Sequence, residues 1–192
     1  MIEKEPGNHK IHRLRVIHLY EADYNLLLCV KWRTAVHHAT RNKTLNPCQK
    51  GRVPGCNATD IIFVEELEYE ICRASRTCLG KIDFDASSCY DRIHCFLANL
   101  ASQKYGVDKN ICIVQGRTLH EAKYHLRTKL EVFEGFISHC TAHPIYGTGQ
   151  GSGNSPVYWL FISSTLFDCH ALRAHGARFC SPDGTLSVDL YM

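Results

Sequence analysis

Glycine stands at every second position from 147 to 153, and Ser155-Pro156 follows at once. No other segment limits the backbone of this 192-residue chain so strongly, because glycine reaches conformations that are closed to other residues. Proline suits the first turn of a helix, where its missing N–H has no partner to lose. The pattern predicts a loop over 147–153 and a helix from Ser155 through Ser163 and Phe167.

Two helices are predicted before the glycine loop in the sequence. From Glu21 to about Arg41 the helical spacing of apolar residues predicts an amphipathic helix. Residues 49–55 are rich in Gly and Pro and predict a loop. A second helix is expected to start at a Thr59 or Asp60 cap and to reach residues 73–76.

The middle of the chain alternates short apolar runs with longer helical patterns. Residues 79–84 predict a buried strand that ends at Asp85. The remaining expected elements are helices over Ser88–Gln103 and Asp108–Glu131, a strand over Phe136–Thr141, and a hairpin with its turn at 181–184, flanked by 177–179 and 186–191.

Composition narrows the class of protein. The net charge of +3 is too small to indicate nucleic-acid binding by itself. The charged N-terminus lacks the apolar core of a signal peptide, which predicts an intracellular protein, nuclear or cytoplasmic. No apolar run approaches the roughly 20 residues that a membrane-spanning helix needs, so no membrane partner is expected.

Eleven cysteines without a Cys-x-x-Cys pair predict mostly buried thiols in a reducing compartment. His139, Cys140 and His143 form the one dense group of soft ligands, so a zinc-stabilised interaction module stays an open alternative.

Asp85 is the first candidate for chemistry. A carboxylate at the end of a buried strand can hold Mg²⁺, which in turn can hold nucleotide phosphates. Asp83 shares the strand face, and Asp91 falls within the next helix. The alternative is that Asp85 is a helix N-cap and Asp91 a surface charge.

Residues 85–91, Asp-Ala-Ser-Ser-Cys-Tyr-Asp, resemble the first palm motif of reverse transcriptases. The resemblance implies that Asp85 is a catalytic, metal-binding carboxylate. It also implies that Tyr90 contacts the nucleotide sugar and excludes a ribose 2′-hydroxyl. Core packing is the alternative role for Tyr90.

Residues 147–156, Gly-Thr-Gly-Gln-Gly-Ser-Gly-Asn-Ser-Pro, resemble the second palm motif of the same family. Gln150 can donate and accept hydrogen bonds, and Gly151 lets the backbone approach a primer, template or nucleotide. An unspecialised glycine loop is the alternative, but the two motifs stand in the order of the family.

Upstream, residues 10–17 resemble the basic fingers strand, and residues 49–55 resemble a loop of non-LTR-type enzymes. Arginine binds phosphate with two parallel hydrogen bonds, so Arg15, with Arg13 or Lys10, is the candidate for the triphosphate. Taken singly, each is equally consistent with a solvated basic strand. Cys56 stands where the family commonly has an Arg.

The resemblance implies an RNA-directed DNA polymerase of a retroelement, which uses an RNA template, a DNA primer, deoxynucleoside triphosphates and Mg²⁺. The third palm motif, with its Asp-Asp pair, is absent from the sequence. We therefore expect a fragment that is inactive alone. The expected fold is α+β, with partial fingers over 1–60 and, over 61–192, a palm whose small antiparallel sheet is backed by helices. The alternatives are an undifferentiated α/β domain and a non-catalytic nucleic-acid-binding remnant.

Overall fold

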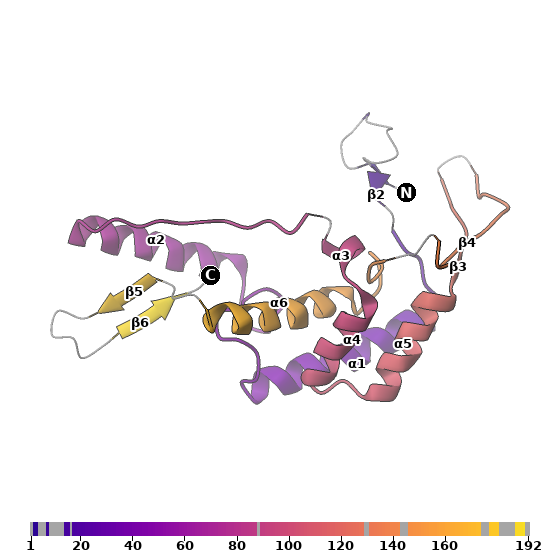
Figure 1. Ribbon diagram of the computed structural model, residues 1–192, viewed down its shortest axis with the longest axis horizontal. Coiled ribbons are helices and arrows are strands. Elements are labelled where there is room, and N and C mark those ends of the chain that lie inside the picture. The colour runs from indigo at the N-terminus through magenta and orange to yellow at the C-terminus, as the bar shows by residue number, and fades with distance from the viewer. Residues whose placement is uncertain are drawn as a thin grey trace.

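The computed structural model describes residues 17–87, 89–128, 131–142 and 146–173 with their side chains. It also describes Gly7 and the backbone of residues 2–3, 14–15, 177–180 and 187–190. This part of the chain is mostly helical (Figure 1). The helices are α1 Ala22–Arg41, α2 Ala58–Ser75, α3 Cys89–Arg92, α4 Cys95–Lys104, α5 Lys109–Glu121 and α6 Ser155–Ala171.

The strands are short and pair only with a neighbour in sequence. They are β1 Ile2–Glu3, β2 Leu14–Arg15, β3 Lys123–Tyr124, β4 Ile137–Ser138, β5 Ala177–Cys180 and β6 Ser187–Leu190. Each described sheet is a two-stranded antiparallel ladder, in the order β1-β2, β3-β4 and β5-β6. The expected combination of helices with a small antiparallel sheet is therefore present, but no one sheet gathers these strands.

The core lies where α1, α4, α5 and α6 pack together. Trp32 of α1 is fully buried, and its Nε1 donates to Ser102 Oγ of α4 at 3.1 Å. Tyr158 of α6 meets the Trp32 ring edge-on at 5.3 Å between centroids. Tyr105 stacks on Phe161 at 4.7 Å. These contacts join α1 and the end of α4 to α6, the helix that follows the glycine loop.

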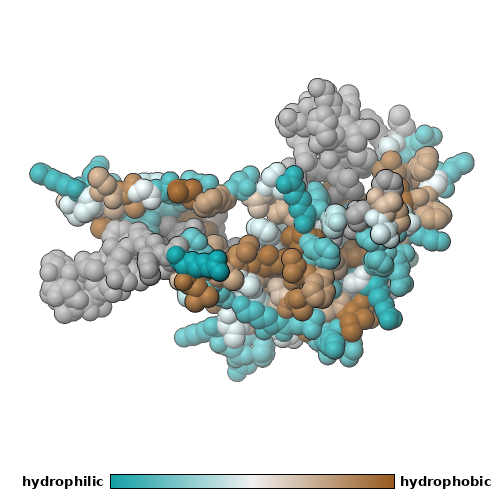
Figure 2. Space-filling model, viewed as in Figure 1, coloured by the Kyte–Doolittle hydropathy of each residue, from teal (hydrophilic) through white to brown (hydrophobic). Residues whose placement is uncertain are grey.

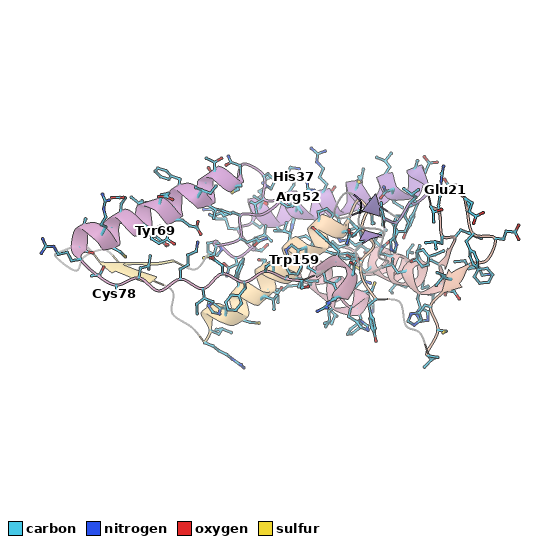
Figure 3. The ribbon with its side chains drawn as sticks, turned by 90° about the horizontal axis from the view of Figure 1, so that it is seen from above. Glu21, His37, Arg52, Tyr69, Cys78 and Trp159 are labelled. Atoms are coloured by element: carbon cyan, nitrogen blue, oxygen red, sulfur yellow. The ribbon has the colours of Figure 1, made fainter. Side chains whose placement is uncertain are left out.

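Helix α2 forms an arm that extends away from this core (Figures 1 and 3). Only Cys72 of α2 is buried, while Phe63 is 68% exposed. Figure 2 shows apolar residues among the hydrophilic ones along the arm. Arg76 ends the helix in a left-handed conformation, with φ of 54°. The chain then runs back beside α2 toward α3, and Lys81 forms an ion pair with Glu65 of α2.

The prediction of a buried strand over 79–84 is wrong. Residues 79–86 have no assigned strand, and Ile82 and Phe84 are 78% and 90% exposed. Figure 1 shows this segment running beside α2, and no described strand pairs with it. Asp85 therefore follows an exposed extended segment instead of a buried strand.

Several helix and strand boundaries differ from the predicted ones, because of a side-chain cap or because of strand pairing. The helix expected over 88–103 is broken at Ile93-His94, because His94 takes extended angles and its Nδ1 accepts from Phe96 N at 3.3 Å, which starts α4. Helix α5 ends at Glu121 instead of 131, because Lys123–Tyr124 turns into an extended ladder with β4. The strand expected over 136–141 is limited to β4 for the same reason. The helix over 21–41, the helix from Ser155 and the antiparallel pairing of β5 with β6 are confirmed. The turn expected at 181–184 lies outside the described residues.

The start of α2 has a reciprocal cap. Asn57 Oδ1 accepts from Asp60 N at 3.1 Å, and Asp60 Oδ2 accepts from Asn57 N at 2.8 Å. We expect Asn57→Ala to lower the free energy of unfolding by about 1 kcal/mol and to speed hydrogen exchange in the first turn of α2. Asn57→Ser should retain most of both values. Equal exchange in all three proteins would contradict the role of the cap.

None of the helices in the described ranges is long and apolar enough to cross a membrane.

Candidate functional site

The glycine loop lies directly against α3. Thr148 N donates to Tyr90 O at 2.9 Å, and Gly147 N donates to Ile93 O at 3.0 Å. Gly147 has φ of 103°, and a Cβ added there would lie 2.7 Å from Tyr90 O. Glycine is therefore required at 147 both for its backbone conformation and for the closeness of α3.

The other side of the loop is held by the segment before α1. His18 N donates to Gln150 O at 2.6 Å. Gly151 has φ of 108°, and a side chain there would collide with His18 O. Gly153 N donates to Asn25 Oδ1 of α1 at 2.6 Å. Three segments that are distant in sequence therefore fix the course of the loop.

The first residue of α6 forms hydrogen bonds with the backbone of the loop. Ser155 Oγ lies 2.7 Å from both Thr148 O and Gly149 O, so one hydroxyl bridges two loop carbonyls. Thr148 and Asn154 are fully buried. The loop is thus a packed part of the structure.

Gln150 and Asp91 form the polar contact between the two motifs. Gln150 Nε2 lies 3.2 Å from each carboxylate oxygen of Asp91. Asp91 is exposed, and Tyr90 beside it is half-buried. Burial raises the pKa of Tyr90, helped by Cys89 and opposed by Arg52, so the phenol stays protonated at neutral pH. The arrangement places an amide and a carboxylate side by side, where they can form hydrogen bonds with a polar ligand.

Asp85 lies apart from that surface contact. Its side chain is exposed, and within the described residues it makes no hydrogen bond or ion pair. The neighbouring Asp83 pairs with Lys81 at 3.3 Å. Among described side chains no three His, Cys, Asp or Glu residues converge as a metal site would require. Asp85 is therefore a single carboxylate here.

The other site residues predicted from the sequence differ in where the structure places them. Gln150 bonds Asp91, and the Tyr90 carbonyl accepts from Thr148 N of the loop. Gly151 lies against His18 instead. Arg13 lies outside the described residues, and Arg15 is placed only by its backbone in β2. His143 of the zinc alternative also lies outside them.

Sequence reasoning missed two contributors. Asp91 was expected within a helix with no defined partner, yet it bonds Gln150. His18 had no predicted role, yet its backbone holds Gln150 and its Nδ1 lies 3.3 Å from Tyr20 Oη. Nothing in the local sequence indicated either contact.

Comparison of the chain with family models, with curated proteins and with solved structures finds no match. The functional argument therefore depends on the residues and contacts described above.

Proposed function

We propose that this chain is the fingers-and-palm part of a retroelement RNA-directed DNA polymerase, and that it binds primer–template and deoxynucleoside triphosphate. The observation that supports the proposal is the contact between the two motif segments. Residues 90–93 hold the start of the loop through two backbone hydrogen bonds, and Gln150 bonds Asp91.

The proposed roles follow from what each group presents. Gln150 exposes an amide that exchanges its bond to Asp91 for one to a base or sugar, and Gly151 keeps the backbone open to a strand. Tyr90 supplies a rigid ring beside the sugar, where a 2′-hydroxyl would meet it. Arg15, with Arg13 or Lys10, is proposed for the triphosphate.

The described residues do not by themselves fit a Mg²⁺ site. Mg²⁺ requires near-octahedral oxygen ligands, and Asp85 is the only candidate carboxylate of the first motif that is not already paired. We therefore propose Asp85 as one ligand among several in the complete polymerase. No catalytic step is derived through the metal.

The palm sheet is likewise part of the proposal. Ile82 and Phe84 are exposed, and we propose that they belong to a strand whose neighbour is supplied elsewhere in the complete polymerase. Pairing there would turn residues 79–84 into the strand that the family resemblance implies and would fix Asp85 at its end.

Binding of a short DNA primer on an RNA template tests the proposed surface. We expect Gln150→Ala to weaken binding by about tenfold, because a hydrogen bond to the nucleic acid is lost. Gln103→Ala on α4 is the matched control and should change affinity less than twofold. Affinity should fall as salt rises. Equal effects of the two substitutions, or no binding at low salt, would contradict the proposal.

A second candidate function is nucleic-acid binding without catalysis. The lone position of Asp85 among the described carboxylates favours it. In that case Asp85→Asn would leave binding intact, and the protein in its natural length would not extend a primer on RNA with Mg²⁺. Extension that Asp85→Asn abolishes would instead support the polymerase.

A further inference from the structure

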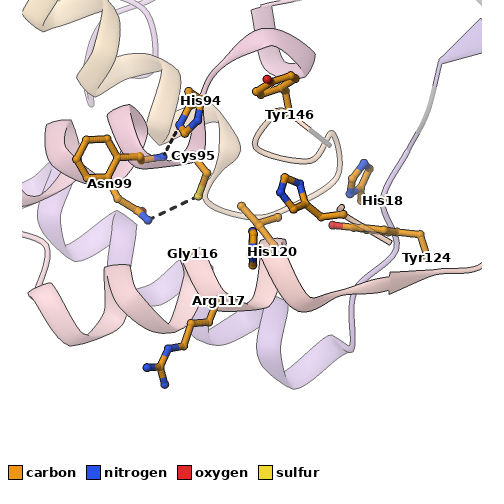
Figure 4. A pocket seen from close by; sticks show the side chains of 13 residues that line it. His18, His94, Cys95, Asn99, Gly116, Arg117, His120, Tyr124 and Tyr146 are labelled. Carbon is orange, nitrogen blue, oxygen red and sulfur yellow. Dashed lines mark hydrogen bonds between the residues drawn. The ribbon is translucent and has the colours of Figure 1, made fainter. Parts of the chain in front are cut away.

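A pocket of about 370 Å³ opens beside the glycine loop, and Gly147 is part of its lining. Figure 4 shows the side chains that line it. Its volume is within the range of about 300–1,000 Å³ that is typical of small-molecule sites. The described lining contains no Asp or Glu, and Arg117 is its one formally charged side chain. Figure 4 shows Arg117 directed away from the ring side chains.

Most of the lining consists of planar rings. Six of them form three pairs, and the two rings of each pair come from different segments of the chain. His18 meets Tyr124 of β3 edge-on at 5.1 Å between centroids. His94, before α4, lies 5.9 Å from Tyr146 at the start of the loop. His120 of α5 lies 4.3 Å from His139, which follows β4. With Phe96 of α4, seven rings line the pocket.

These rings are not the interior of the core. Tyr146 is 55% exposed and Phe96, also in the lining, is 61% exposed. Exposed rings grouped around an open pocket present flat apolar faces to whatever enters. A planar ligand is the shape that such faces complement.

The imidazoles add hydrogen-bonding edges to the flat faces. Burial lowers the pKa of His18, although Asp91 acts to raise it, so its ring is neutral at pH 7. A neutral imidazole has one donor and one acceptor nitrogen. A ligand with a π-face and a mixed donor and acceptor edge satisfies both features, and purine and pyrimidine bases have this chemistry.

We propose that this pocket binds a single nucleobase, either of a free nucleotide or of an unpaired residue in a strand. The site borders the Gln150–Asp91 contact, because His18 holds Gln150 and also lines the pocket, but the proposal does not depend on the polymerase assignment. It recognises the base by stacking and edge hydrogen bonds, and it offers little to a phosphate because Arg117 faces away. A fully paired duplex, whose bases are stacked internally, would not enter.

Equilibrium dialysis against adenosine 5′-monophosphate and ribose 5-phosphate tests the proposal on the 192-residue chain. A short duplex with one unpaired adenine and the same duplex fully paired are used as competitors. We expect the nucleotide to bind and ribose 5-phosphate not to bind. Competition by the bulged duplex alone would identify a strand as the source, and absence of competition would identify the free nucleotide.

Two tyrosine variants provide a matched comparison. Tyr146→Ala should weaken nucleotide binding about tenfold, because one stacking face is lost, whereas Tyr146→Phe should retain it. Tyr69→Ala removes a 45% exposed ring from α2, outside the pocket, and should change binding less than twofold. Equal binding of the nucleotide and ribose 5-phosphate, no binding of either, or equal effects of Tyr146→Ala and Tyr69→Ala would overturn the proposal.

Discussion

Trp32→Ala is expected to lower the free energy of unfolding by about 3–5 kcal/mol, the largest single-residue effect that we predict. Trp32 is fully buried, so its removal leaves a cavity among α1, α4 and α6. The change also deprives Ser102 Oγ of the indole N–H and Tyr158 of its edge contact. Urea denaturation followed by circular dichroism measures the loss.

The second tryptophan of the chain provides the control. Trp159 lies on the same core helix as Tyr158 but is only half-buried. Trp159→Ala should therefore cost about half as much, because less apolar surface leaves contact and water can fill the gap. Similar losses from both substitutions would contradict the placement of the core around Trp32.

Gly147→Ala is expected to cost about 2–4 kcal/mol and to weaken primer–template binding. A left-handed φ of 103° strains any residue with a Cβ, and that Cβ would approach Tyr90 O at 2.7 Å. Relief requires the loop to move away from α3, which breaks the Thr148–Tyr90 hydrogen bond. Denaturation measures the first effect, and binding of a DNA primer on an RNA template measures the second.

Gly55→Ala separates the effect of backbone strain from the effect of close packing on the free energy of unfolding. Gly55 has φ of 83°, but an added Cβ would meet no heavy atom within 4 Å. Its substitution should cost about 1 kcal/mol from backbone strain alone and leave binding unchanged. If Gly55→Ala and Gly147→Ala proved equivalent in both measurements, close packing of the loop on α3 would not be supported.

Much of the fold could be predicted from local sequence. The helix over 22–41 follows from its apolar spacing, and α6 begins at Ser155-Pro156 as the proline indicates. The cap at Asp108 was also recognisable, since its Oδ1 accepts from Asn110 N at 2.8 Å. These features depend on neighbours within a few residues, which a sequence displays directly.

The errors arose where distant partners decide the structure. Residues 79–84 have the pattern of a strand, but a strand needs a partner, and no described segment supplies one. The break between α3 and α4 depends on His94, a residue type that is not a common cap. The sequence placed Tyr90 and Gln150 in motifs, but the bond from Gln150 to Asp91 and the support from His18 needed three dimensions.

The central claim is that the first motif and the glycine loop form one primer-binding surface. A primer with a photoreactive base at its 3′ end, paired to an RNA template and irradiated with the 192-residue chain, tests this most directly. Peptide mapping should place the adducts within residues 85–91 and 147–153, and Gly147→Ala should reduce both. Adducts confined to α2, or unchanged by Gly147→Ala, would contradict the account.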